Sequence, residues 1–210
     1  MQSGYKLSPL VGYHGCDKAV AEKVLSGQAH LNHSENEYDW LGDGIYFWVD
    51  SYERAWEWAK MRSKKKPYVV GAFIDPGLCL NLTDYGVTSE LKTAYQFLKE
   101  TYAQISEDLP TNAVMQHGKP MTRKLDCAVI KAAHQLRQDI GKPSFDTVYG
   151  VFEEGAVLYP GSALKEHTHV QIAVRNQQSI IGYFRPEQLI STYYERHYPC
   201  WWKWVWRKRH

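Results

Sequence analysis

Cysteine is scarce in this chain, which has four cysteines in 210 residues: Cys16, Cys79, Cys127 and Cys200. No two of them form a CxxC pair, the spacing that marks most zinc modules, and they are too scattered for a compact disulfide framework. Their distribution argues against both kinds of small stapled fold. Reduced thiols in a cytoplasmic compartment fit the pattern best.

Long apolar runs are also missing. No stretch of about 18 apolar residues occurs, and the first residues, MQSGYKLSPLVGYHG, lack the apolar centre of a signal peptide. The sequence therefore predicts no membrane partner. A net charge of +2, from 25 basic and 23 acidic residues, excludes a strongly basic bulk nucleic-acid binder but leaves room for local patches.

The hydrophobic content of 44% is enough for one good core, so we expect a single domain over residues 1–210. Periodicity and turn residues predict strands and helices in alternation. Besides the GIYFW segment at 44–48, the expected strands are 6–15, 68–75, 146–154, 169–176 and 179–184. The expected helices are 16–28, 51–66, 88–105 and 124–140. Strands on both sides of a helical insertion, at about 88–141, predict an α+β fold with a mainly antiparallel sheet.

Three separated segments follow one another in an order that resembles a known enzyme class. They are YHG at 13–15, GDGIYF at 42–47 and VQIAVRNQQSII at 170–181. Together they resemble the three motifs of the ADP-ribosyltransferases of the His-Tyr-Glu class, which contains the poly(ADP-ribose) polymerases and the diphtheria toxin catalytic domain. The resemblance implies an ADP-ribosyltransferase-like split antiparallel β-sheet core, with NAD as the substrate.

The same resemblance implies a role for each motif residue. Gly15 has no Cβ, so its backbone would approach the nicotinamide carboxamide, while His14 would hydrogen-bond a ribose hydroxyl. Tyr46 would stack its flat ring on the nicotinamide. A second aromatic side chain, Trp56 or Trp58 from the following helix, would complete the clamp, although core packing explains both tryptophans as well.

Gln171 stands where the class commonly has a glutamate. Glutamine can still hydrogen-bond a ribose hydroxyl, but it carries no negative charge to stabilise an oxocarbenium-like ribose, and such a loss costs on the order of 100- to 1000-fold in rate elsewhere. Several explanations stay open: a lineage that works with glutamine, a carboxylate from Glu153 or Glu154, a substitution that disarms a toxic enzyme, or an inactive fold. Similar bacterial sequences with a DWLGxGIYFW segment and a THxQI-type third motif favour a native glutamine, assisted by His169.

Other polar residues give weaker indications. The HTH triplet at 167–169 suggests a metal only superficially, because alternate residues of a strand point to opposite faces, so we expect no metal site. Arg54 and Arg175 are candidates for the pyrophosphate of NAD. Solvated or ion-paired arginines are the commoner case, however.

The segment PCWWKWVWRKRH at 199–210 interleaves aromatic and basic residues. As a strand, it would carry Trp202, Trp204 and Trp206 on one face, suited either to stacking on bases or to docking on protein. We favour docking for the tryptophans themselves. The basic run RSKKKP at 62–67 indicates either a phosphate-facing patch or a solvated helix end.

The sequence thus predicts a cytoplasmic, NAD-dependent mono-ADP-ribosyltransferase in which His14, Tyr46 and Gln171 serve catalysis. By family analogy it is a bacterial toxin or antiphage effector, with an antitoxin or another protein as a further partner. The acceptor is a macromolecule, with RNA or DNA slightly favoured over protein because of the aromatic-basic segment. Two alternatives remain: an inactive module that binds NAD, ADP-ribose or a partner, and an NAD glycohydrolase in which water is the acceptor.

Overall fold

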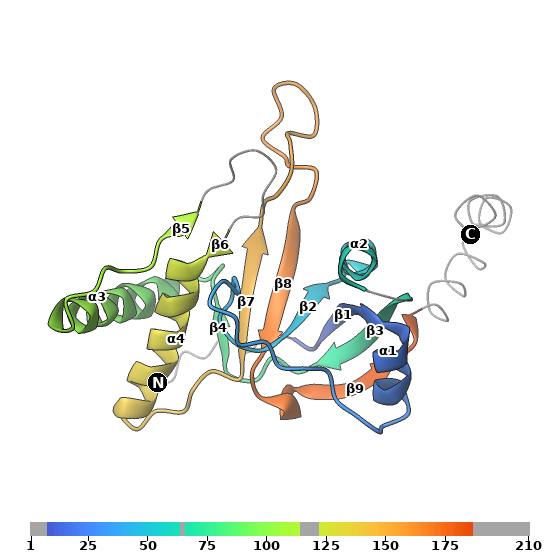
Figure 1. The fold of residues 1–210 in the computed structure, drawn as a ribbon, viewed down its shortest axis with the longest axis horizontal. Helices are drawn as coiled ribbons and strands as arrows, with labels where there is room; N and C mark the ends of the chain where they lie inside the picture. Colours follow the sequence, from blue (N-terminus) through green and yellow to red (C-terminus); the bar gives the residue numbers. More distant parts are fainter. Residues whose placement is uncertain (1–7, 64–65, 114–121, 187–210) are drawn as a thin grey trace, which may run out of the picture.

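The computed structural model describes residues 8–63, 66–113 and 122–186, which form helices around one large sheet (Figure 1). The seven strands of this sheet are, in spatial order, β4 (Cys79–Asn81), β7 (Thr147–Phe152), β8 (His169–Val174), β2 (Ile45–Val49), β1 (Leu10–Asp17), β3 (Pro67–Ile74) and β9 (Ile180–Phe184). The β4–β7 pair is parallel, and the other neighbouring strands are antiparallel. The α+β class is confirmed.

In the described part of the chain, four α-helices are divided between the two ends of the sheet. They are α1 (Lys18–Leu25), α2 (Tyr52–Arg62), α3 (Thr88–Gln104) and α4 (Lys124–Asp139). Figure 1 shows α3 and α4 beside β4 and β7, with α1 and α2 beside β1 and β3. Two short 3-10 helices, η1 (Tyr85–Val87) and η2 (Gln177–Ser179), and a small ladder of β5 (Asn112–Ala113) with β6 (Thr122–Arg123) complete the described elements.

The sheet is least continuous between β1 and β2. β1 pairs with β3 along its whole length, but its register with β2 consists of Gly12 opposite Val49 and Tyr13 opposite Trp48. β2 instead runs along β8, from Ile45 opposite Val174 to Trp48 opposite Gln171. The central strands therefore divide into a β4-β7-β8-β2 group and a β1-β3-β9 group that are joined over a short distance.

Alternation along β2 distributes its side chains between the two faces of the sheet. Ile45, Phe47 and Val49 pack in the cluster that α1 covers. On the opposite face, Tyr46 packs against the cluster that includes Ile130 of α4, and Trp48 packs with Ala55 of α2. The run of large apolar residues before α2 is explained by burial on both faces.

The local patterns located most elements correctly, with shifts at their ends. The helix predicted over 16–28, with Gly27 as its stop signal, ends at Leu25. Gly27 takes a left-handed conformation with φ 75°, and its N–H donates to the Val24 carbonyl. The short strands β4, β5 and β6 had no sequence signal. None of the helices in the described part of the chain is both long and apolar enough to cross a membrane.

Two segments that the sequence singled out fall wholly or partly outside the described residues. Residues 199–210 lie outside the described ranges, as do residues 64 and 65 of the basic run at 62–67. The predictions that concern the tryptophan-rich segment and the basic patch therefore remain predictions.

Candidate functional site

Tyr46 and Gln171 lie on neighbouring strands and on the same face of the sheet. Gln171 of β8 is directly opposite Trp48 of β2, and Tyr46 is opposite Ala173. The two predicted residues are therefore diagonal cross-strand neighbours, a relation in which Cβ atoms are typically about 7–8 Å apart. The fold brings these two motif residues together.

His14 lies on the other face, at the point where β1 and β2 part. Its ring contacts Phe47 edge-on with 5.7 Å between ring centroids, and its Nδ1 lies 2.7 Å from the backbone oxygen of Tyr46. Since that oxygen can only accept, Nδ1 carries the proton. Burial lowers the pKa of His14, although the bond to the Tyr46 carbonyl opposes this effect. The His14 imidazole thus donates a hydrogen bond to the β2 backbone just beyond the point where the β1–β2 ladder ends.

Gly15 is placed against α2. A Cβ at this position would clash with the backbone oxygen of Ala55 and come 2.9 Å from the backbone N of Ala59. Ala55 and Ala59 are themselves fully buried. The missing side chain of Gly15, together with two alanines, lets the backbones of α2 and β1 approach closely.

The hydroxyl of Tyr46 is bound by the turn that precedes its own strand. It donates to the backbone oxygen of Gly42 at 2.7 Å and accepts from the backbone N–H of Leu41 at 2.8 Å. Burial raises the pKa of Tyr46, so the phenol stays protonated. Tyr46 therefore fixes the DWLGDG turn, in which Gly42 and Gly44 both have positive φ angles.

Arg175 braces the same turn from the far end of β8. Its Nε donates to both carboxylate oxygens of Asp43, at 3.2 and 3.1 Å, and one guanidinium nitrogen lies 3.1 Å from Nδ1 of His134. Nε2 of His33 also lies 3.1 Å from a carboxylate oxygen of Asp43. Arg175 is thus ion-paired at a turn, which the sequence analysis gave as the commoner case for such an arginine.

Arg54 links α2 to the end of β7. One guanidinium nitrogen lies 2.6 Å from a carboxylate oxygen of Glu154, and the other lies 2.7 Å from Glu57. The same Glu154 oxygen is 3.7 Å from Nδ1 of His169. Arg54 and Glu154, two of the residues considered from the sequence, therefore meet beside the β8 residues.

His169 connects this ion pair to Gln171. Its Nδ1 lies 2.7 Å from the backbone oxygen of His167, and its Nε2 lies 2.9 Å from the side-chain nitrogen of Gln171. Burial lowers the pKa of His169 and nearby Arg54 lowers it further, while the bond to the His167 carbonyl and the Glu154 carboxylate oppose this shift. A polar chain thus runs from Arg54 through Glu154 and His169 to Gln171, on the face of the sheet that carries Tyr46.

The two candidate tryptophans of α2 occupy different environments. Trp56 packs beside the Trp48, Ala55 and Val69 cluster. Trp58 is 40% exposed, lies 5.6 Å from the Trp48 ring and has the Arg62 guanidinium 5.4 Å above it. The side of α2 that faces β1 carries the fully buried Ala55 and Ala59, because the close approach at Gly15 leaves too little room there for an indole.

Trp48 is a residue of this site that the sequence analysis missed. It is 5% exposed, lies directly opposite Gln171, and its buried Nε1 has no hydrogen-bond partner among the described residues. The period-2 alternation of β2 was the available signal, because it places Trp48 on the same face as Tyr46.

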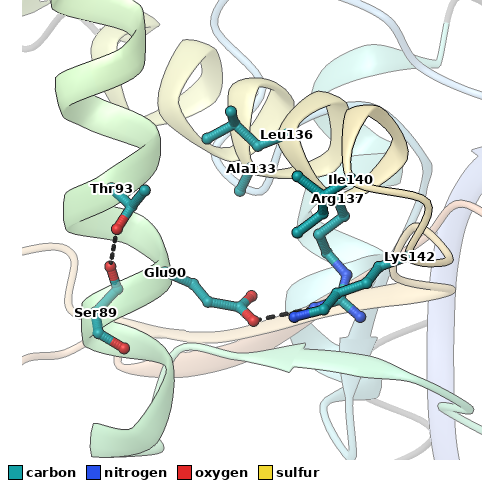
Figure 2. Close-up of a pocket in the computed structure, with 8 residues that line it drawn as sticks. All are labelled: Ser89, Glu90, Thr93, Ala133, Leu136, Arg137, Ile140 and Lys142. Carbon is teal, nitrogen blue, oxygen red and sulfur yellow. Dashed lines mark hydrogen bonds and ion pairs between the residues drawn. The ribbon is translucent and has the colours of Figure 1, made fainter.

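A hollow of about 190 Å³ lies elsewhere, between α3 and α4 (Figure 2). Its lining combines an apolar wall, which includes Leu136 and Ile140, with the ion pair of Arg137 and Glu90 at 3.0 Å. None of the motif residues lines it. Among the described residues no group of three or more histidine, cysteine or acidic side chains is arranged to hold a metal ion. Within the HTH triplet, the His169 ring binds the backbone oxygen of His167.

No protein-family model matches this chain. It is 36% identical over 55 residues to an uncharacterized protein of Methanocaldococcus jannaschii, a match that spans 26% of this chain and 25% of that protein. A crystal structure of an anti-CRISPR protein aligns with 83% of this chain and 94% of its own, at 11% identity and a TM-score of 0.33.

Proposed function

We propose that the protein is an NAD-dependent mono-ADP-ribosyltransferase of the His-Tyr-Glu class with an ADP-ribosyltransferase-like split sheet, working in the cytoplasm as a bacterial toxin or antiphage effector. The observation that supports this proposal is the arrangement of the three motif strands. β8, β2 and β1 are neighbours in that order, Tyr46 and Gln171 share one face, and the β1–β2 ladder ends next to His14.

In the proposed reaction the bond between nicotinamide and ribose breaks, and nicotinamide leaves with the bonding electrons. The anomeric carbon then bonds to a nucleophile of the acceptor, which gives up a proton. Gln171 would accept a hydrogen bond from a ribose hydroxyl and so orient the sugar. His14 and Gly15 would bind NAD at the parted edges of β1 and β2, and Tyr46 with Trp56 or Trp58 would flank the nicotinamide.

Arg54 is the proposed partner of the NAD pyrophosphate, because guanidinium groups bind phosphate oxygens in pairs. In the structure the same guanidinium binds Glu154 and Glu57. NAD would therefore compete with two carboxylates. If a phosphate replaced Glu154 as the partner of Arg54, the Glu154 carboxylate would be free to accept a hydrogen bond from the Nδ1–H group of His169, which lies 3.7 Å away.

The first experiment incubates the purified protein with isotope-labelled NAD and cell lysate, while free nicotinamide is measured. The products are divided into nuclease-treated and protease-treated halves. We expect macromolecular label that nuclease removes. Gln171→Ala should abolish labelling with the circular dichroism spectrum unchanged, whereas Gln178→Ala, a control at an exposed glutamine of η2, should label normally.

Each other result selects a different function. Label that protease removes would identify a protein acceptor, and nicotinamide release without labelled macromolecule would identify an NAD glycohydrolase. Neither release nor label, with NAD binding retained, would contradict the transferase proposal. It would support an inactive binding module, which the uncharged Gln171 and the fully bonded Tyr46 hydroxyl favour.

The proposed nucleic-acid acceptor rests on the aromatic-basic segment at 199–210 and has its own test. Deletion of this segment should weaken RNA or DNA binding and reduce the dependence of binding on salt, because fewer phosphates are neutralised. A folded truncated protein with unchanged binding would contradict a nucleic-acid role for the segment. Loss of solubility would instead favour docking of its tryptophans on protein.

A further inference from the structure

The hydrogen bonds of His169 fix which of its nitrogens carries the proton. Nδ1 faces the backbone oxygen of His167 at 2.7 Å, and a carbonyl oxygen can only accept, so Nδ1 is the donor. The ring is neutral at neutral pH, because burial lowers the pKa of His169. Nε2 consequently presents a lone pair to its neighbour, Gln171.

That lone pair determines the orientation of the Gln171 amide. The side-chain nitrogen of Gln171 lies 2.9 Å from Nε2 of His169, a distance suited to an N–H···N hydrogen bond. A flipped amide would place its oxygen against the lone pair, and two acceptors repel. The NH₂ group of Gln171 is thus held by His169, and its oxygen is directed the other way, without a hydrogen bond to the described residues.

The imidazole is itself held firmly. Its side chain is 1% exposed, so solvent does not compete for Nε2. The ring stacks with Trp40 at 6.5 Å and 25° between planes, and lies 5.9 Å from the ring of Phe152. The charged and titratable groups around it are Arg54 of α2, Glu154 after β7 and His167 of its own segment. Packing leaves the ring little freedom to turn away from Gln171.

We infer that His169 is a positioning residue that keeps the side-chain oxygen of Gln171 turned toward the ribose of bound NAD, an inference that rests on the proposed function. It gives a physical reason for glutamine at this position. A glutamate would direct a second acceptor at the Nε2 lone pair, and it would be accommodated only if His169 took up a proton. The neutral histidine and the amide are therefore matched to each other.

The first test needs no turnover. Nitrogen-detected NMR of the ligand-free, full-length protein should show His169 protonated at Nδ1 and unprotonated at Nε2, with the signal assigned by its loss in His169→Phe. In Gln171→Glu the imidazole pKa should rise by about one unit or more, since a carboxylate in contact favours the charged ring. A proton on Nε2 in the wild-type protein, or an unchanged pKa in Gln171→Glu, would overturn the inference.

The second test compares kcat and KM for nicotinamide release. His169→Phe keeps the ring packing but removes the acceptor, so kcat/KM should fall about tenfold, the worth of one hydrogen bond. His169→Gln should recover most of this loss, because its side-chain oxygen can accept from Gln171. His167→Ala is the control, since His167 contributes its backbone oxygen. Wild-type kinetics in His169→Phe, or no rescue by His169→Gln, would contradict the positioning role.

Failure of the proposed function would be seen separately. If the wild-type protein releases no nicotinamide, NAD affinity is measured by calorimetry for the same variants. We then expect weaker NAD binding in His169→Phe and recovered binding in His169→Gln. A wild-type protein that neither turns over nor binds NAD would overturn the proposed function and, with it, the ligand assigned to Gln171. The wrong His169 tautomer would overturn the positioning inference alone.

Discussion

Gly15 and Tyr46 each make a packing contact in addition to the contact with nicotinamide that is proposed for them. Gly15 leaves space for the α2 backbone, and the Tyr46 hydroxyl closes the preceding turn. Because a packing role and a ligand role affect different measurements, stability and activity can be separated at each residue.

Gly15→Ala should destabilise the protein. The added methyl group would meet the backbone of α2 instead of a flexible side chain, so the helix must shift, at a cost of about 1–3 kcal/mol. The measurement is the free energy of unfolding in urea. Gly182→Ala is the matched control, because a Cβ at this β9 position meets no atom within 4 Å. Equal stability of the two variants would contradict the close approach of α2 to β1.

Tyr46→Phe separates the hydroxyl from the ring. The variant leaves the N–H of Leu41 and the oxygen of Gly42 without their partner in a buried turn, which should cost about 1–3 kcal/mol in the free energy of unfolding. Tyr85→Phe, at a side chain that is 94% exposed, should leave stability unchanged. If Tyr46→Phe is as stable as the wild-type protein, the hydroxyl does not support the turn.

At the scale of elements, α2 is held to the sheet in two ways. Its alanines pack on β1, and Arg54 reaches Glu154 at the end of β7. The second contact joins the β1-β3-β9 group to the β4-β7-β8-β2 group. Within the sheet these two groups are connected by the short β1–β2 ladder. The ion pair therefore stabilises the relative position of the two groups next to Gln171.

A double-mutant cycle can measure this link. The side chains of Arg54 and Glu154 are 18% and 28% exposed, so solvent screens their attraction less than at an open surface, and we expect a coupling energy of about 1 kcal/mol. The control cycle uses Lys18 and Glu22, which are 47% and 58% exposed and 3.8 Å apart, with an expected coupling below about 0.5 kcal/mol. Equal couplings would show that the Arg54 contact does not hold α2.

At the scale of the whole molecule, three of the described histidines are held in the neutral form: His134 and His169 are buried, and His14 is half-buried. Burial is the main cause of the lowered pKa at His14, His134 and His169, and nearby Arg175 helps to lower that of His134 to about 4. In the unfolded chain a histidine has a pKa of about 6.5. As the pH falls below that value the unfolded state takes up protons before the folded state does, and stability decreases.

The free energy of unfolding should accordingly fall between about pH 6.5 and pH 4, by up to about 1.4 kcal/mol per pH unit for each histidine that titrates. Urea unfolding at about pH 7 and about pH 5 measures the change. His134→Asn, which keeps an acceptor for Arg175, should reduce the pH dependence by the contribution of one histidine. A flat profile in the wild-type protein would contradict neutral burial of these histidines.

Short-range patterns in the sequence were enough to predict most of the helices and strands. The apolar runs predicted β1, β2, β3, β7, β8 and β9, and helical spacing with end signals such as Gly27 predicted the four helices. β4 was not predicted, because its three residues are too few to show a pattern and its parallel pairing with β7 joins distant parts of the chain. The motif order also gave the candidate residues Tyr46 and Gln171, but not their distance apart.

Tertiary structure alone decided what those residues touch. The contact of Gly15 with α2 and that of Arg54 with Glu154 join residues 40 to 100 positions apart, and nothing local specifies either. Even the bond between His169 and Gln171, two positions apart, depends on burial of the ring and on the carbonyl that fixes its proton. Periodicity determines which face a side chain takes, whereas packing determines which partner it meets there, because that partner comes from another part of the chain.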